Sequence, residues 1–230
     1  MKQKISVVIP ARNEEGYIKR TLFSLLNQTF QDFEIIVVAN GCTDKTEELV
    51  RKRENKRLKL YSLTKANVSL ARNFGAKMAK GELLVFLDAD TLLNNDALQK
   101  INNIFSDEEI GVATTKVLPD SDELKFKLAM MFKNVYNSTG IYKGCGGVLC
   151  CRTDNFDDVK GYDELKVREH RKLILKLLAI GKYKCVDTYA ITSMRRLKDW
   201  GLSGSALFWA KQFVKDKLGN LKGSDYEMVR

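Results

Sequence analysis

Apolar runs that read as strands alternate with segments of helical periodicity through the first half of this chain. Residues 4–10 (KISVVIP), 33–40 (FEIIVVAN) and 83–90 (LLVFLDAD) each hold an almost unbroken apolar stretch, which is typical of a strand buried on both faces. Between them, segments such as 17–28 (YIKRTLFSLLNQ) place apolar residues at helical spacing. This alternation predicts an α/β fold whose mostly parallel, Rossmann-like sheet is flanked by helices.

Two local patterns indicate where helices begin and end. Asp44 and Glu47 stand at the spacing of a capping box and predict a helix start. Gly81 follows the helical segment 69–80, where a left-handed residue would close the helix at little cost.

After about residue 116 the alternation changes. Residues 122–137 are helical with a mixed face, residues 143–153 form a glycine-rich loop that enters a strand, and residues 169–183 are strongly helical. We find no proline- or serine-rich linker and no internal repeat. We therefore expect a continuous domain over residues 1–195, with halves at 1–115 and 116–195, followed by a tail at 196–230.

Composition and charge limit the class of protein. Apolar residues make up 44% of the chain, which is a globular composition, and the formal net charge of +10 favours an anionic partner such as nucleotide phosphates, acidic lipid or nucleic acid. No nucleic-acid-binding motif is recognisable, so we expect no nucleic-acid partner. No signal peptide is visible, and the five cysteines show no CxxC pair, so they are expected to be reduced thiols of a cytoplasmic protein.

Two carboxylates, Asp88 and Asp90, follow the apolar run 83–87. In an extended segment, residues two apart point the same way, so both carboxylates are expected to converge on one cation. Oxygen ligands suit Mg²⁺ or Mn²⁺, which are usually shared with substrate phosphates. In the alternative interpretation, Asp90 caps a turn and Asp88 faces water.

Polar residues also follow three other predicted strands, at 10–14, 40–44 and 65–73. Ligands of open parallel sheets bind beyond the carboxyl ends of the strands, so these segments predict a pocket at one rim of the sheet. Arg12, Lys65 and Arg72 would supply positive charge for phosphate groups there.

The segments ISVVIPARNEE, FEIIVVANGCTDKT, SLARNFGAKMAKGE, LVFLDAD and GYDE…REHRKLILKLLAIGK together resemble the family 2 glycosyltransferases of GT-A fold. The resemblance covers residues 4–185 and implies transfer of a sugar from a UDP- or GDP-linked donor with Mn²⁺ or Mg²⁺ as cofactor. It further implies that the donor contacts are Pro10, Ala11, Arg12, Asn13, Glu14, Asn40, Lys65, Arg72, Asn73, Asp88, Ala89 and Asp90, with Asp88 and Asp90 at the metal.

Two positions depart from that family's pattern. Ala39-Asn40 stands where the family usually has two aspartates, the second of which contacts the uracil base, so UDP is only the leading donor. Glu169-His170 stands where the family has a Glu-Asp pair that supplies the general base. Both side chains lie four residues before apolar ones and share the inward face of a helix. We take Glu169 as the base with His170 assisting; helix-end complementation by Glu169 and a packed His170 are the alternatives.

Two segments bear on the acceptor. Gly146 and Gly147 correspond to the family's acceptor-side loop, or else form a tight turn before a strand. The tail mixes aromatic and basic side chains, which is typical of an amphipathic helix that either lies on an anionic membrane, on its inner face, or packs its apolar side on the domain. The acceptor would be a saccharide or a polyprenyl-linked molecule. A polyprenyl-phosphate glycosyl synthase and a non-catalytic sugar-nucleotide binder are the competing functions.

Overall fold

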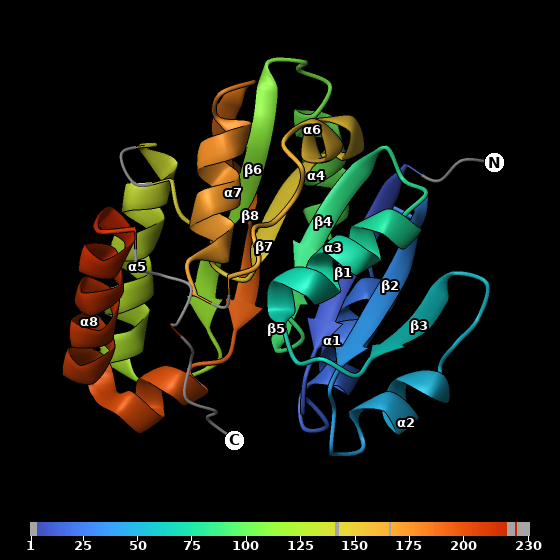
Figure 1. Ribbon diagram of the computed structural model, residues 1–230, viewed down its shortest axis with the longest axis horizontal. Coiled ribbons are helices and arrows are strands. Elements are labelled where there is room, and N and C mark those ends of the chain that lie inside the picture. Colours follow the sequence, from blue (N-terminus) through green and yellow to red (C-terminus); the bar gives the residue numbers. More distant parts are fainter. Residues whose placement is uncertain (1–3, 141–142, 166, 220–223, 225–230) are drawn as a thin grey trace.

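The computed structural model describes residues 4–140, 143–165, 167–219 and 224. Its centre is an eight-stranded sheet in the order β3-β2-β1-β4-β7-β6-β8-β5 (Figure 1). The strands are β1 (Ile5–Ala11), β2 (Phe33–Asn40), β3 (Leu58–Leu63), β4 (Leu83–Leu87), β5 (Thr91–Leu93), β6 (Ile110–Pro119), β7 (Val148–Arg152) and β8 (Lys182–Thr192).

The sheet is mixed, because β7 runs against both of its neighbours. Strands β1 to β4 pair in parallel, β7 is antiparallel to β4 and to β6, and β6 pairs in parallel with β8. Two successive reversals return β6 and β8 to the direction of β1. The carboxyl ends of β1, β2, β3, β4, β6 and β8 therefore share one rim, which extends the predicted rim across the second half of the chain.

Helices cover both faces of the sheet, as the continuous apolar runs predict. The core on one face includes residues of α1 (Ile18–Leu26), α2 (Thr46–Arg51) and α4 (Ala97–Ile104). On the other face the sheet packs against α3 (Val68–Met78), α6 (Thr153–Asp158) and α7 (Glu169–Leu177). Helix α5 (Leu124–Ser138) packs beside the end of β6 through Phe126 and Met130.

Helix α2 (Thr46–Arg51) begins two residues after Asp44, as predicted, and α3 ends shortly before Gly81, but neither signal makes the predicted contact. The Asp44 carboxylate accepts a hydrogen bond from the backbone N–H of Thr46 at 2.9 Å, but Glu47 accepts one from the Ser62 hydroxyl instead of closing a capping box. Helix α3 ends at Met78, and Gly81 does not have a positive φ. A Cβ at Gly81 would lie 2.5 Å from the backbone nitrogen of Ser6, so close packing is the reason for glycine there.

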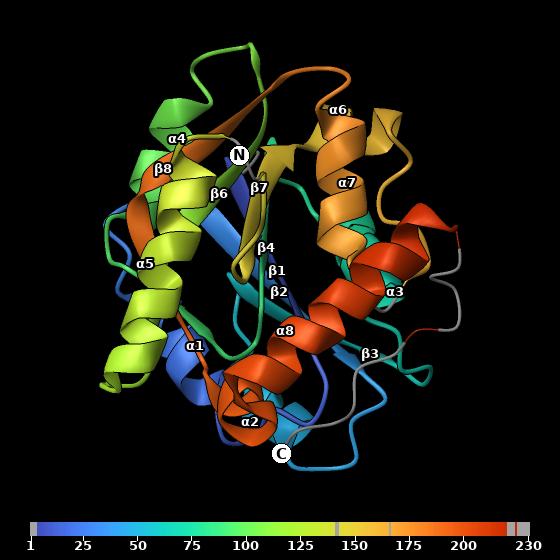
Figure 2. The ribbon, with the colours of Figure 1, turned by 90° about the vertical axis from the view of Figure 1, so that its left-hand side faces the viewer.

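The predicted tail is a long helix, α8 (Arg195–Lys217), interrupted at Gly201, where φ is +70°. It crosses the front of the molecule in Figure 2, in which α5 lies on the same side. Residues 220–223 and 225–230 of the tail lie outside the described residues. Within the described part of the chain, none of the helices combines the length and the apolar character needed to span a bilayer.

Candidate active site

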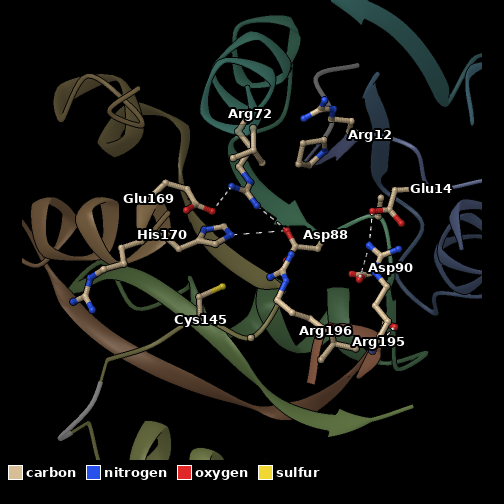
Figure 3. Close-up of a pocket in the computed structure, with 18 of the residues that line it drawn as sticks. Arg12, Glu14, Arg72, Asp88, Asp90, Cys145, Glu169, His170, Arg195 and Arg196 are labelled. Atoms are coloured by element: carbon tan, nitrogen blue, oxygen red, sulfur yellow. Dashed lines mark hydrogen bonds and ion pairs between the residues drawn. The ribbon is translucent and has the colours of Figure 1, made fainter. Parts of the chain in front are cut away.

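A cavity of about 450 Å³ lies at the shared rim of the sheet (Figure 3). Loops that follow β1, β2 and β4 form one side of it, and the segments around α5, α7 and the start of α8 form the other. Most of the predicted site residues line this cavity: Pro10, Arg12, Asn13, Glu14, Asn40, Arg72, Asp88, Ala89, Asp90, Gly146, Gly147, Glu169 and His170.

Three residues assigned to the donor lie elsewhere. Ala11 is fully buried in the core, and Lys65 is exposed and does not line the cavity. The Asn73 side chain exchanges two hydrogen bonds with the backbone of Tyr162, at 2.8 and 2.9 Å. Asn73 therefore fastens the loop before α7 to α3.

The loops after β1 and β2 are joined by their own side chains. Asn13, which has a φ of +55°, accepts a hydrogen bond from the backbone N–H of Thr43 at 2.8 Å and donates one to the Thr43 hydroxyl at 3.1 Å. The backbone N–H of Glu14 donates to the Thr46 hydroxyl at 2.7 Å. Asn40 donates its amide to the backbone carbonyl of Ala11 at 3.1 Å. These bonds fix the wall of the cavity where the resemblance places the nucleotide.

A buried arginine joins the two halves of the cavity. The Arg72 guanidinium, on α3, donates to Asp88 at 2.7 Å and to Glu169 at 2.9 Å, and its side chain is only 3% exposed. Burial alone raises the pKa of Asp88, but His170 and Arg72 outweigh it and hold the pKa well below its usual range. We call Arg72, Asp88 and Glu169 the Arg72 cluster.

His170 lies between the Arg72 cluster and the glycine-rich loop. Its Nδ1 is 2.9 Å from the Tyr162 hydroxyl, and its Nε2 is 3.9 Å from the Asp88 carboxylate. Burial and the Arg72 charge lower the pKa of His170, but Cys145 and Asp88 outweigh them and raise it to about 9. The raised pKa favours the imidazolium form of His170 in this arrangement.

A second arginine bridges two carboxylates on the opposite side of the cavity. Arg195, at the start of α8, lies 2.5 Å from the Glu14 carboxylate and 3.2 Å from Asp90. Burial and the Asp88 carboxylate raise the pKa of Asp90 to about 7, although Arg195 opposes them. Burial likewise raises the pKa of Glu14 against the effect of Arg195. We call these three residues the Arg195 cluster.

The Arg195 cluster has the chemistry of a site for a divalent cation. One carboxylate oxygen of Glu14, Oε2, is buried without a hydrogen-bond partner among the described residues. Arg195 contacts both of these partly buried carboxylates, and the charge of Arg196 also lowers the pKa of Asp90. The described residues contain no group of three or more His, Cys, Asp or Glu side chains that could hold a metal by themselves. Mg²⁺ and Mn²⁺ commonly bind one or two carboxylates and complete their shell with substrate phosphates and water, which these residues fit.

The two aspartates after β4 belong to different clusters. The backbone N–H of Thr91 donates to the Asp88 carbonyl at 3.1 Å, so the chain turns there and residues two apart no longer share a direction. Asp88 is bonded to Arg72 and Asp90 lies against Arg195. The Asp88 charge nevertheless raises the pKa of Asp90, and convergence of both carboxylates on one cation stays a prediction.

Both glycines of the acceptor-side loop are required by packing. A Cβ at Gly146 would lie 2.0 Å from a Val117 methyl carbon. Gly147 has a φ of +91°, and its carbonyl accepts a hydrogen bond from the backbone N–H of Asp88 at 2.9 Å. Both glycines also line the cavity beside Asp88, and their role on the acceptor side stays a prediction.

Several cavity residues were missed from the sequence, namely Asn67, Lys133, Cys145, Arg168, Arg171, Thr192, Ser193, Arg195, Arg196 and Trp209. The group at 192–196 lies at the carboxyl end of β8 on the shared rim, a position that only the observed strand pairing reveals. Arg195 is the last residue of the predicted domain and Arg196 the first of the predicted tail, and neither had been assigned to the site. Lys133 and Trp209 lie in the middle of helices, and nothing in their local sequence indicates a pocket.

Comparison with known proteins identifies a glycosyltransferase family. The family model for glycosyl transferase family 2 matches residues 6–156. An uncharacterized glycosyltransferase of Haemophilus influenzae is 37% identical over 99 residues, which cover 42% of this chain and 40% of that protein. The matched segment therefore spans well under half the length of that relative.

Two solved structures share the fold. Staphylococcus aureus TarS in complex with UDP-GlcNAc superposes with a TM-score of 0.67 at 24% identity, over 83% of this chain and 58% of that one. The Pyrobaculum calidifontis mannosyltransferase PcManGT, in complex with GDP-Man and Mn²⁺, superposes with a TM-score of 0.71 at 20% identity, over 83% and 57%. The predicted GT-A fold is confirmed.

Proposed function

The chain belongs to glycosyl transferase family 2, and from this premise we propose that it is a metal-dependent, inverting enzyme. Its donor is a UDP- or GDP-linked sugar, and its acceptor is a saccharide or a lipid-linked molecule. The observation that carries the proposal is the Arg195 cluster, in which two partly buried carboxylates at the sheet rim both contact Arg195. The Mn²⁺ and GDP-Man bound to PcManGT support a metal and a nucleotide sugar in a fold of this kind.

The joined loops after β1 and β2 would hold the nucleoside. Asn40 is buried at the end of β2 and uses its amide N–H on Ala11. Its side-chain oxygen is an acceptor that is suited to a base N–H. Because an amide replaces the family's usual aspartate here, we keep both uracil and guanine as candidate bases.

Asp90, with Glu14 beside it, would hold the cation. A bound Mn²⁺ or Mg²⁺ supplies Lewis-acid stabilisation of the charge that develops on the leaving diphosphate. Arg12, Arg195 and protonated His170 line the same cavity and would add positive charge around the diphosphate. Arg72 pairs with Asp88 and Glu169, and only its buried Nε lacks a hydrogen-bond partner among the described residues, so we assign it to positioning.

Glu169 is the better candidate for the base. A general base must be able to accept a proton, and imidazolium His170 cannot do so at neutral pH. Glu169 is a carboxylate that lines the cavity, oriented by Arg72 at 2.9 Å. In the proposed step the acceptor oxygen attacks the anomeric carbon, the bond to the diphosphate breaks, and the acceptor proton moves to Glu169.

A second candidate acceptor is a polyprenyl phosphate. The acceptor side of the cavity carries Lys133, Arg171 and protonated His170 beside Glu169. An acceptor that is already an anion would be attracted by these cations and needs little help from a base. Comparing transfer to polyprenyl phosphate with transfer to saccharides, in wild type and Glu169→Gln, separates the two: only a hydroxyl acceptor should depend strongly on Glu169.

The proposal is tested by thermal-shift measurements with UDP- and GDP-sugars, with and without Mn²⁺. We expect one donor class to stabilise the protein and Mn²⁺ to increase that stabilisation. The Mn²⁺-dependent part should disappear in Asp90→Asn, whereas Asp96→Asn, at the start of α4, should retain it. Binding without hydrolysis or transfer to any acceptor would instead support the non-catalytic sugar-nucleotide binder.

A further inference from the structure

Helix α5 is apolar on two opposite sides. It buries Phe126 and Met130 against the core, as a surface helix should. The opposite side, which would ordinarily be polar, exposes a row of large apolar residues at spacings of three and four. They are Leu124 (70% exposed), Leu128, Met131, Phe132 (61%), Val135 and Tyr136.

Beyond Gly201, helix α8 buries polar residues and exposes apolar ones, the opposite of an ordinary surface helix. The residues it buries are Ser205 and Gln212, which are polar. The residues it exposes include Leu202, Leu207 (73%), Trp209, Phe213, Val214 and Leu218 (75%). The expected alternative, in which the tail packs its apolar side on the domain, does not describe this part of the helix.

The two helices lie on one side of the molecule (Figure 2). Both reach the active-site cavity, because Lys133 of α5 and Trp209 of α8 line it. Helix α8 is fastened to the start of α7 by Asp216, which pairs with Arg168 at 3.0 Å and Lys172 at 2.6 Å. We call the exposed sides of these two helices the α5–α8 face.

The charge of the two helices indicates what covers this face. Together their sequences carry nine basic residues and two acidic ones, Asp199 and Asp216. Asp216 is paired inward, so Asp199 is the exposed carboxylate of the two, whereas Lys198, Lys211 and Lys217 are exposed. Asp122 and Glu123, just before α5, balance Lys127 and Lys125 at that end. The excess positive charge therefore lies mainly on α8.

We propose that the α5–α8 face binds an anionic phospholipid bilayer. Its apolar side chains would enter the boundary between headgroups and acyl chains while its lysines contact the headgroups. A symmetric contact with a second copy would place these lysines opposite one another, which disfavours self-association. This inference does not depend on sugar transfer.

One consequence does rest on the proposed function. Because both helices line the cavity, binding through this face would bring the acceptor side of the cavity close to the headgroups. A lipid-linked acceptor could then enter without leaving the bilayer.

The test is co-sedimentation of the full chain with vesicles of phosphatidylcholine, with or without phosphatidylglycerol. We expect binding to the anionic vesicles that weakens as salt is raised, and at least about tenfold weaker binding to the neutral ones. Phe132→Ser/Val135→Ser on α5 and Leu207→Ser/Leu218→Ser on α8 should each lower the partition coefficient by about tenfold. The matched control, Phe23→Ser/Leu26→Ser, removes similarly exposed apolar residues from α1 and should bind like wild type.

Failure to pellet with anionic vesicles, equal binding to neutral vesicles, or an equal loss in the α1 control would overturn the proposal. If the protein were a dimer in solution and the α5 variant a monomer, the α5–α8 face would instead bind a second copy of the chain. Donor-induced thermal shifts, measured without vesicles, report separately on the proposed function. Loss of those shifts with intact vesicle binding would count against sugar transfer alone.

Discussion

The Arg72 and Arg195 clusters both place one guanidinium between two carboxylates, but they differ in how completely charge is balanced. In the Arg72 cluster the arginine is almost fully buried, and both of its carboxylates lie within 2.9 Å. The nearby imidazolium adds a second cation, and the pKa of Asp88 is depressed. In the Arg195 cluster the pKa of both carboxylates is raised and one Glu14 oxygen has no described partner.

This difference separates a charge-balanced cluster from one that is suited to bind a cation. Carboxylates whose charge is fully compensated inside the protein gain little from a further cation. Carboxylates whose pKa is raised by burial and by the charge of the nearby Asp88 carboxylate are poised to gain from one. We therefore propose that the Arg72 cluster makes the site rigid. In the Arg195 cluster, a divalent cation would take the place of the arginine beside Asp90 and Glu14.

The largest effect, on the free energy of unfolding, should come from a substitution in the Arg72 cluster. Replacing Arg72 with Met leaves Asp88 and Glu169 without their counter-charge, and breaking such a buried pair typically destabilises a protein by about 3–5 kcal/mol. The measurement is the free energy of unfolding by urea. Arg12→Met, which removes an exposed arginine from the same cavity, should change it by less than about 0.5 kcal/mol. If both variants unfold alike, the Arg72 cluster is not a stabilising element.

Removing the proposed base tests the chemical role of the same cluster. Glu169→Gln keeps a hydrogen-bond acceptor for Arg72 but cannot take a proton, so turnover with a hydroxyl acceptor should fall by roughly 10²–10⁴. Donor binding, measured by thermal shift, should remain close to that of wild type. His170→Asn should reduce turnover less, since it removes a cation near the diphosphate and leaves the base. A larger loss in His170→Asn than in Glu169→Gln would reverse the two roles.

The sequence predicted which residues lie at the rim of the sheet better than it predicted which of them contact one another. The apolar runs that end in polar residues placed Asp88, Asp90, Asn40 and Arg12 correctly around one cavity, because strand direction alone determines which loops meet. The grouping of those residues depended on the turn after Leu87. Its backbone sends Asp88 and Asp90 toward different arginines, and periodicity carries no information about that turn.

Arg195 shows a different reason for a missed residue. It stands next to the aromatic and basic residues of the predicted amphipathic tail. The boundary between the predicted domain (1–195) and the predicted tail (196–230) was placed directly after it. Its contact with Glu14 joins residues 181 positions apart. Recognising it required knowing that β8 runs in the direction of β1, which follows only from the two antiparallel pairings of β7.

A substitution in the Arg195 cluster should have an effect of intermediate size, on the affinity for Mn²⁺. In the donor-free protein, Mn²⁺ must compete with the Arg195 guanidinium for Asp90 and Glu14. Arg195→Gln removes that competitor, so Mn²⁺ alone should bind about tenfold more tightly, equivalent to roughly 1.4 kcal/mol. Electron paramagnetic resonance of free Mn²⁺ measures this without any turnover. The neighbouring Arg196→Gln is the control, and equal tightening in both variants would mean a general effect of charge.

The smallest effect should come from the loop that carries Glu14. Asn13→Gly keeps the left-handed backbone conformation but removes the two hydrogen bonds to Thr43, at a cost of about 1 kcal/mol in unfolding free energy. Because this loop belongs to the Arg195 cluster, backbone hydrogen exchange should rise at residues 12–15 and 41–46. Exchange at residues 167–173, beside the Arg72 cluster, should stay as it is in wild type. Faster exchange in both segments would show that the two clusters are one cooperative unit and that the contrast between them is not functional.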